Sequence, residues 1–352
     1  MNYDLWFIIL EISNRKKYEL INIYENCENI YNNYEYIVNS DNIVSKKLEN
    51  YKKSDFYEKV QRLDEQLYRN DIKYITGANP LYKDKLEGIL QKPFYLFYKG
   101  NIEVINKKSV AVVGARKCSK YGFAATKLLT KELITNNITL VSGGARGIDS
   151  IAHKTALENE GLNISVMGCG LDRVYPYENK MLFSKIQEKG VLLSEYLPGT
   201  RPNAYNFPQR NRIISGLADT VIVIEASEKS GSLITADLAL KQSKRVIVVP
   251  GSIFYDGANG SNDLINRMGV EAFSTIENFR QLLNFDHVNI TPLKFTPEKS
   301  EILDVLSDTP VHIDDILKNT SVDKGALYAL LFEMQIKNQI ICLPGNYYIK
   351  TI

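Results

Sequence analysis

The chain has 352 residues, of which 44% are hydrophobic and 24% are charged, and its formal net charge is +2. The length allows two or three domains, and the composition is that of ordinary globular proteins. The near-neutral charge excludes nucleic-acid binding through net charge alone, so any such site must be a local basic patch. Four cysteines without a CxxC pair and three scattered histidines favour a reducing compartment and predict neither a metal site nor a cofactor.

Residues 1–70 are expected to form a small helical domain, because their apolar positions recur at helical spacing. Acidic residues interrupt the first apolar run, and no stretch approaches the length of a membrane span, so a cytoplasmic location is expected. Residues 71–105 are broken by several glycines and prolines. We expect them to connect the helical domain to the next one and to pack on its core.

Residues 106–285 alternate helical stretches with short apolar runs rich in β-branched residues. The runs are SVAVVG, ITLVSGG, NISVMGCG, GVLLSE, DTVIVIEA and RVIVVPG. Such runs are typical of parallel strands covered on both faces. Their alternation with helices predicts an α/β fold, a Rossmann-like, doubly wound, mostly parallel sheet. Ligands bind such sheets at the carboxyl ends of the strands, so the loops after the runs are the expected site.

The last region, residues 291–352, has a different pattern. Three amphipathic helices and then a hairpin over 344–346 predict a winged-helix-like domain. The third helix, DKGALYALLFEMQIKNQ, has few cations, whereas a DNA-reading helix normally shows arginine or lysine toward the groove. A protein-contact or structural role is therefore favoured for this domain.

Four loops after the runs carry residues suited to binding anions. Arg116 stands where a dinucleotide fingerprint has its second glycine, which disfavours NAD and favours a guanidinium–phosphate contact. The turn after the second run has N–H groups that can point at an anion near a helix start. The candidate ligands in the four loops are Gly114, Arg116, Ser142, Gly143, Gly144, Arg146, Gly147, Arg210, Asn211, Arg212, Lys229, Ser230, Gly231 and Ser232. A run of backbone phosphates would use all four loops, whereas a single nucleotide needs fewer.

Other polar side chains near these loops have roles that the pattern leaves open. Asp149 is expected to cap a helix rather than contact a ligand, and His153 is expected to be structural. Glu195 and Glu225 could act as bases or hold arginines in place, and the second role is favoured because many cations surround them. No catalytic set of nucleophile and base emerges, so we do not expect an enzyme.

Five stretches together resemble the DNA-processing protein A family, also called DprA or Smf. They are VAVVGARKCSKYG, LVSGGARGIDSIAHKTAL, VMGCGLDRVYPYENKML, the stretch from LLSEYLPGT to SLITADLAL, and VIVVPGSI. The resemblance implies a single-stranded DNA-binding protein that protects incoming DNA and helps load the RecA recombinase in natural transformation and recombination. It also implies a homodimer through the Rossmann-like domain, a SAM or helix-hairpin-helix-like N-terminal domain, and phosphate contacts by Arg116 and the Ser142–Gly144 turn.

Two positions depart from the family's pattern. Tyr177 stands in place of a DNA-binding lysine, so we expect Lys180, or stacking by Tyr177, to take over that contact. The stretch EISNRKKYEL lacks the glycine of the family's helical hairpin, so that contact is lost or is made by Arg15, Lys16 and Lys17.

Two other functions remain as alternatives. One is a Rossmann-like nucleotide-processing hydrolase of the phosphoribohydrolase type, but the PGGxGTxxE signature that supplies its catalytic glutamate is absent. The other is a structural or signalling nucleotide sensor, which would require tight binding of a mononucleotide.

Overall fold

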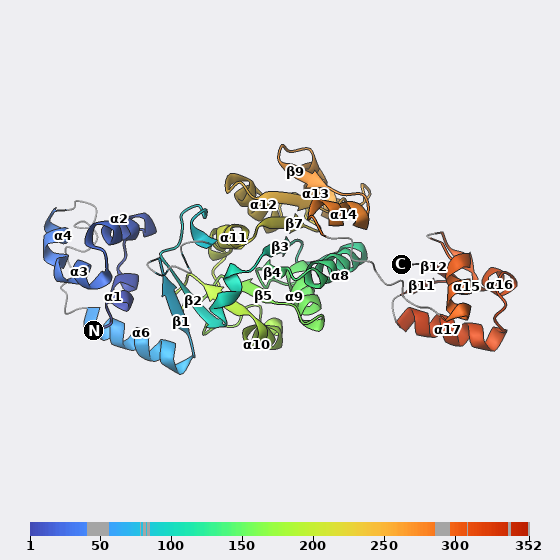
Figure 1. The fold of residues 1–352 in the computed structure, drawn as a ribbon, viewed down its shortest axis with the longest axis horizontal. Helices are drawn as coiled ribbons and strands as arrows, with labels where there is room; N and C mark the ends of the chain where they lie inside the picture. Colours follow the sequence, from blue (N-terminus) through green and yellow to red (C-terminus); the bar gives the residue numbers. More distant parts are fainter. Residues whose placement is uncertain are drawn as a thin grey trace. The chain divides into compact units, whose positions relative to one another are not determined.

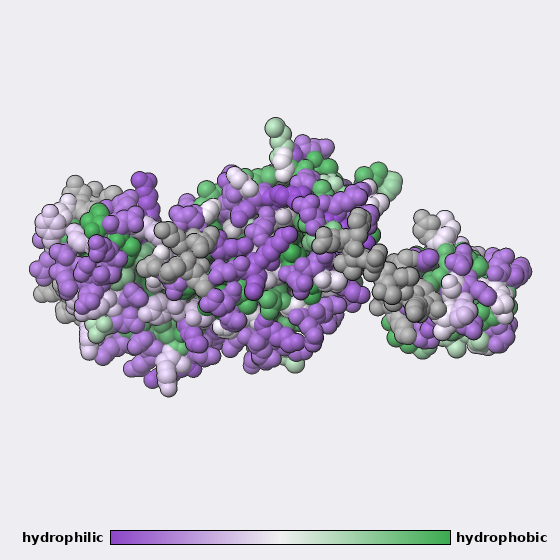
Figure 2. Space-filling view, in the orientation of Figure 1, coloured by the Kyte–Doolittle hydropathy of each residue, from purple (hydrophilic) through white to green (hydrophobic). Residues whose placement is uncertain are grey.

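The structure is a computed structural model that describes residues 1–40, 56–77, 79, 82, 85–285, 296–307, 309–336 and 339–350. The chain forms two compact units, Met1–Leu283 and Asn284–Ile352. No helix in these described ranges is long and apolar enough to cross a membrane. Figure 2 shows hydrophilic residues over much of the visible face of the first unit.

A nine-stranded sheet forms the centre of the first unit, in the order β1-β2-β6-β5-β4-β3-β7-β8-β9 (Figure 1). Its strands are β1 (Lys73–Thr76), β2 (Tyr95–Gly100), β3 (Ser109–Val113), β4 (Thr139–Ser142), β5 (Asn163–Val166), β6 (Val191–Ser194), β7 (Thr220–Val223), β8 (Arg245–Val248) and β9 (Val270–Ala272). In the order of the sheet, neighbouring strands from β6 through β9 are parallel. At the other edge, β2 pairs antiparallel with β6, and β1 pairs antiparallel with β2. All six apolar runs are strands, and every residue of β3 to β7 is buried. The predicted doubly wound, mostly parallel sheet is confirmed.

Helices cover both faces of this sheet (Figure 1). On one face lie α8 (Lys120–Thr135), α9 (Ile148–Glu158) and α10 (Lys180–Lys189); on the other lie α11 (Asn206–Leu217) and α12 (Gly231–Lys241). The chain adds strands first on one side of β3 and then, from β7, on the other. At such a switch point the loops after the two neighbouring strands diverge, and a crevice opens at the carboxyl ends. The loops after β3, β4 and β7 therefore meet at one edge of the sheet.

The N-terminal helices are packed onto the edge of the sheet. They are α1 (Tyr3–Ile9), α2 (Asn14–Tyr24), α3 (Cys27–Asn32), α4 (Tyr34–Ser40) and α6 (Tyr57–Arg69). Phe7 of α1 and Phe94 share one buried cluster, with ring centroids 5.1 Å apart in an edge-to-face contact. Residues 71–105, expected as a connecting segment, supply β1 and β2 to the sheet. The helical region and the sheet therefore share a hydrophobic core.

Lys17, one of the three cations considered as a substitute DNA contact, is buried in this region. Its side-chain nitrogen donates to the carbonyl oxygen of Ile8 at 2.6 Å and lies 5.2 Å from the ring centroid of Tyr95. Burial lowers the pKa of Lys17 to about 7. An ammonium enclosed in this way does not reach DNA, so Lys17 does not provide the substitute contact that the sequence left open. Arg15 and Lys16 each pair with Glu19.

His153 lies in the core beneath the glycine turn that follows β4. It is fully buried, and its Nδ1 is 2.9 Å from Oδ1 of Asn163, which confirms the expected structural role. Burial lowers the pKa of His153 from 6.5 to about 4. Between these two values the unfolded chain binds a proton that the folded protein does not, so stability is lost as the pH falls.

We expect the titration of His153 to lower the free energy of unfolding by about 2 kcal/mol as the pH falls from about 7 to about 5. Urea unfolding of the parent and of His153→Gln across this range measures the effect. The variant should show a shallower loss of unfolding free energy on acidification, whatever its stability at neutral pH. Equal pH slopes for the two proteins would show that His153 is not the group responsible.

The second unit has its own core and confirms the predicted winged-helix-like domain. Its elements are α15 (Pro297–Val305), β10 (Val311–His312), α16 (Ile313–Lys318), α17 (Lys324–Ile336), β11 (Ile340–Leu343) and β12 (Tyr347–Lys350), and the strand order is β10-β12-β11. Tyr328, Phe332 and Ile336 recur every four residues on α17 and are all exposed. This helix therefore presents apolar rather than basic side chains, in keeping with a role in protein contact.

The remaining described elements complete the first unit. They are the short 3-10 helices η2 (Ile102–Asn106), η3 (Tyr177–Asn179) and η4 (Asp256–Ala258), with α13 (Asn259–Ile265) and α14 (Ile276–Leu282). Helices α13 and α14 follow β8 and β9, at the edge of the sheet opposite β1. Only η3 lies in a segment that the sequence links to DNA binding.

Candidate nucleic-acid interface

A cavity of about 500 Å³ opens at the carboxyl ends of the parallel strands. Its walls are the loops after β3 and β7, part of the turn after β4, and the N-terminal parts of α11 and α12. The predicted ligands that line it are Gly114, Arg116, Arg210, Asn211, Lys229, Ser230, Gly231 and Ser232. The switch point therefore gathers residues from three of the four predicted loops, whereas the turn after β4 contributes only Ala145.

The rim of this cavity carries cations that have no carboxylate partner. Arg116, Lys117 and Lys229 are exposed, and none of them forms an ion pair with another described residue. Among the described residues of the lining, Asp149 is the one carboxylate, and it is buried. An anion that enters the cavity thus meets positive charge without displacing an acidic side chain. Lys117 adjoins Arg116 in the sequence, but the glycine-loop pattern did not single it out.

Phe207 organises two of the guanidinium groups. The Cζ atoms of Arg116 and Arg210 lie 5.7 Å and 5.9 Å from its ring centroid. A guanidinium held over a ring keeps its N–H donors available for a phosphate. Tyr175 supports Phe207 from the side, with ring centroids 5.4 Å apart. Phe207 was not predicted as a site residue, because its signal in the sequence is just an aromatic residue at the start of a helix beside arginines.

The glycine turn after β4 is closed by Asp149. Its Oδ2 accepts hydrogen bonds from the N–H groups of Gly143 and Ala145, each at 3.2 Å. The hydroxyl of Ser142 is buried and donates to the carbonyl oxygen of Val112 at 2.7 Å. The expectation that Ser142 and Gly143 cradle a phosphate is therefore wrong, because these donors are used inside the protein. Asp149 also does not cap α9, whose N-cap is Gly147.

Gly147 brings this turn against the loop that holds Arg116. Its φ is 71°, and a Cβ atom there would lie 2.3 Å from the carbonyl oxygen of Ala115. The same carbonyl accepts a hydrogen bond from the N–H of Ile148 at 3.2 Å. Only glycine fits a left-handed backbone with so close an approach. Gly144, with a φ of 64°, packs in the same way against Phe183. Both glycines therefore allow the close backbone packing of the turn next to the cavity.

Arg146 and Lys180 lie outside the cavity. Arg146 is exposed, and its guanidinium pairs with the carboxylate of Glu178. Lys180 begins α10 and is exposed, and Tyr177 is 75% exposed. Both substitutes for the family's lysine are thus accessible to a ligand, and the choice between them stays a prediction.

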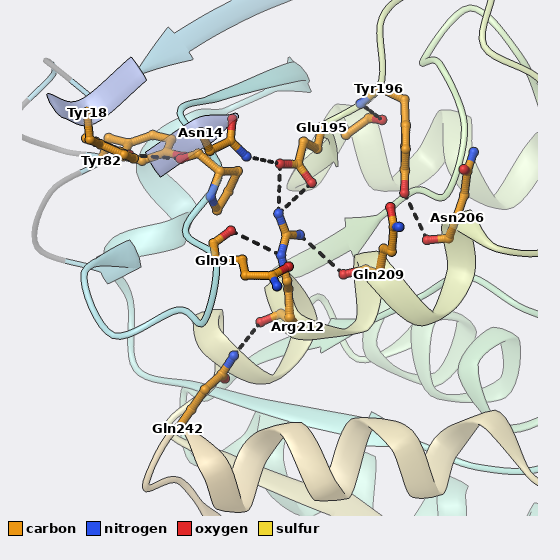
Figure 3. Close-up of polar contacts among 12 residues, drawn as sticks. Asn14, Tyr18, Tyr82, Gln91, Glu195, Tyr196, Asn206, Gln209, Arg212 and Gln242 are labelled. Carbon is orange, nitrogen blue, oxygen red and sulfur yellow. Dashed lines mark hydrogen bonds and ion pairs between the residues drawn. The ribbon is translucent and has the colours of Figure 1, made fainter. Parts of the chain in front are cut away.

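Arg212 lies behind the cavity in a buried network (Figure 3). Its Nη2 is 2.7 Å from both carboxylate oxygens of Glu195, and its Nε and Nη1 donate to the carbonyl oxygens of Gln91 and Gln209 at 3.2 Å. Asn14 of α2 donates to the same carboxylate at 2.9 Å. The prediction that Arg212 contacts DNA is wrong, because the protein uses its donors. Glu195 holds an arginine, as the sequence favoured.

Arg210 and Glu225 also serve the walls of the cavity. Arg210 is 5% exposed, and its Nη1 donates to the carbonyl oxygens of Gly143, at 2.9 Å, and Val166. Burial lowers the pKa of Arg210 to about 10, so Arg210 stays charged at neutral pH and contributes positive potential to the cavity. Glu225 was expected to hold an arginine but instead accepts hydrogen bonds from the N–H and hydroxyl of Ser119, the N-cap of α8.

The start of α12 forms a second anion-facing wall. Its N-cap, Ser230, accepts from the N–H of Ser232 at 3.4 Å. Among the described residues other than its chain neighbours and its own helix, no atom lies within 4 Å of a Cβ built on Gly231, so the helix start is open. Asn211 ties this wall to α11 by donating to the carbonyl oxygen of Gly231 at 3.2 Å. An open helix N-terminus beside the exposed Lys229 attracts negative charge.

Two family models match the chain. One, described as DNA recombination-mediator protein A, matches residues 73–284, which include all nine strands and the cavity. The chain belongs to this family. The other model, the DprA winged helix domain, matches residues 291–346.

Individual members of this family agree with the assignment. DNA processing protein DprA from Streptococcus pneumoniae is 45% identical over 184 residues, which is 52% of this chain and 65% of that protein. Protein Smf from Escherichia coli is 33% identical over 284 residues, 78% of this chain and 76% of that protein. The chain thus covers slightly less than two thirds of the length of the pneumococcal relative.

Solved structures of this family share the fold. The X-ray structure of DprA from Streptococcus pneumoniae superposes with a TM-score of 0.66 at 32% identity, covering 81% of this chain and 98% of that chain. DNA processing protein A from Helicobacter pylori, described for its unique single-stranded DNA binding mode, gives a TM-score of 0.56 at 32% identity. It covers 62% of this chain and 99% of that chain.

Proposed function

We propose that the protein binds single-stranded DNA without sequence preference in the cavity at the switch point. It protects incoming single strands and helps to load the RecA recombinase in natural transformation and recombination. It acts without catalysis, as a homodimer through the Rossmann-like domain. One observation carries the proposal: Arg116, Lys117 and Lys229 surround the cavity exposed and without carboxylate partners among the described residues. The binding mode described for the Helicobacter pylori relative supports single-stranded DNA as the ligand.

The surroundings of the cavity favour a single strand over an isolated phosphate. Single-strand binders combine a cationic groove with aromatic side chains on which bases stack. Phe207 lines the cavity, and two exposed tyrosines lie near it in the structure or in the sequence. Tyr175 contacts the ring of Phe207, and Tyr205 precedes Phe207 by two residues. Phosphate contacts carry no sequence information, which accounts for binding without sequence preference.

The hydrolase alternative gains no support from the cavity. A phosphoribohydrolase needs a free carboxylate as base, and Asp149 is the one acidic side chain in the described lining. Asp149 is occupied by two backbone N–H groups. Incubation with AMP should therefore release no free base.

Gel shifts with single-stranded and duplex oligonucleotides of one sequence, across a salt series, test the proposal. We expect the single strand to bind more tightly. Log Kobs should fall linearly with log[salt], with a slope of about −0.7 for each phosphate neutralised, or about −2 for the three rim cations. Equal affinity for the duplex, or binding that salt does not weaken, would overturn the proposal.

A further inference from the structure

Two hollows adjoin each other beside α10, outside the cavity. One has a volume of about 310 Å³ and extends to β1, and the other has a volume of about 180 Å³ and extends to the segment before η3. Lys99 of β2 and Ser184 and Gln187 of α10 line both hollows. The two hollows therefore share a wall, and we call them together the α10 groove.

The α10 groove is basic. It is lined by the cations Lys73, Lys99, Arg173 and Lys180 and by the acids Asp71 and Glu188. In the described part of the chain, none of these four cations forms an ion pair, although Arg173 donates to the carbonyl oxygen of Gly199 at 2.9 Å. A groove whose cations outnumber its acids attracts an external polyanion.

Lys99 lies in the shared wall and lines both hollows. It is half-buried, and its backbone is fixed on β2 by pairing with Leu192 of β6. Burial lowers the pKa of Lys99, with Asp71 and Asp172 opposing the shift. A phosphate at this position would restore the favourable surroundings that the ammonium loses by leaving water.

One end of the groove lies beside the turn after β4. Lys180 follows Asn179, whose Nδ2 donates to the carbonyl oxygen of Gly144 at 3.0 Å and to the hydroxyl of Ser150 at 2.7 Å. Ala145, the next residue of that turn, lines the cavity. A strand that leaves the cavity across the turn therefore meets Lys180 at the near end of the groove.

We infer that the α10 groove binds the phosphodiester backbone of single-stranded DNA as it extends beyond the cavity. The inference rests on the proposed function of the cavity. Ammonium, hydroxyl and amide groups of Lys73, Lys99, Ser184 and Gln187 provide donors for phosphate oxygens, a chemistry that positions a strand without reading its bases. The groove thus extends the length of strand that one protein molecule holds.

Oligonucleotides of two lengths test the groove in the full chain. A short strand of about six nucleotides fills the cavity alone, whereas one of about twenty also reaches the groove. In the double variant Lys73→Gln/Lys99→Gln, affinity for the long strand should fall about 10-fold at low salt, and its salt slope should become shallower by about 1.4. Affinity for the short strand should not change, which also shows that the variant is folded.

Two further variants make the test specific. Lys107→Gln removes an exposed charge just before β3, at the amino ends of the strands, and should leave both affinities unchanged. Lys99→Arg keeps the charge and should bind the long strand like the parent. If the double variant and Lys107→Gln bind the long strand alike, the inference is overturned.

The remaining outcomes separate the groove from the cavity and from other anions. Arg116→Ala should weaken binding of both lengths; if it weakens neither, the proposed function of the cavity fails. If Arg116→Ala weakens binding but the double variant Lys73→Gln/Lys99→Gln binds the long strand like the parent, the inference about the groove fails while the proposed function of the cavity stands. Inorganic phosphate that raises the melting temperature of the parent but not of the double variant, with unchanged binding of the long strand, would assign the groove to free phosphate and overturn the inference.

Discussion

Replacement of Arg116 by alanine should weaken binding of a single-stranded oligonucleotide about 100-fold at low salt, which is about 2.7 kcal/mol of binding free energy. Arg116 is exposed at the rim of the cavity, forms no ion pair with a described residue, and is held over the ring of Phe207. Its donors are therefore free to form charge-assisted hydrogen bonds with a phosphate, which are about twice as strong as neutral ones. Fluorescence anisotropy with a labelled oligonucleotide at matched salt measures the change.

Two controls separate the guanidinium from its charge. Arg116→Lys keeps the charge but loses the planar fork and the contact with Phe207, so its affinity should lie between those of the parent and the alanine variant. Arg62→Ala removes an exposed arginine from α6, outside the lining of the cavity, and should leave binding unchanged. Binding by Arg116→Ala as tight as that by Arg62→Ala would show that the cavity is not the DNA site.

The sheet could be predicted because its inner strands are uniformly apolar, but its edges could not. Every residue of β3 to β7 is buried, and such strands stand out in the sequence. The outer strands β1 and β9 are short, mix polar with apolar residues and are only partly buried. Their pairing is set by neighbours distant in the sequence, such as Tyr98 for Lys73. No local pattern carries that information.

The site shows the same division between local pattern and distant contact. The loops with Arg116 and Lys229 were identified because glycines and cations directly follow apolar strands. The pattern could not show that Asp149 occupies the N–H groups of the preceding turn, since a ligand and a carboxylate bind such groups alike. Likewise, nothing in the sequence distinguishes Arg212 from Arg210. The structure shows that Glu195, at the end of another strand, binds Arg212.

Replacement of Glu195 by alanine should lower the free energy of unfolding by about 3–5 kcal/mol, because it leaves the buried Arg212 charge unpaired. The two side chains are 16% and 9% exposed, so bulk solvent screens the unpaired charge only weakly. Loss of Glu195 also removes the acceptor of Asn14, which ties α2 to α11 through this network (Figure 3). Urea unfolding monitored by circular dichroism measures the effect.

Arg245 and Glu271 provide the matched control. They also form an arginine–glutamate pair, with an Nη2–Oε2 distance of 2.9 Å, but their side chains are 40% and 37% exposed. Solvent screens such a pair, so Glu271→Ala should cost about 1 kcal/mol or less. A similar loss in both variants would mean that the burial of Arg212 has no special energetic consequence.

A double variant, Glu195→Leu/Arg212→Met, then separates the role of Arg212 in the fold from any role in DNA binding. With no unpaired charge left in the core, it should recover much of the stability that Glu195→Ala loses. Because the guanidinium of Arg212 is used by Glu195, Gln91 and Gln209, the double variant should bind single-stranded DNA like the parent. A stable double variant with binding as weak as that of Arg116→Ala would restore Arg212 as a DNA ligand. Parental binding would instead limit the phosphate-contacting cations of the cavity to its open rim.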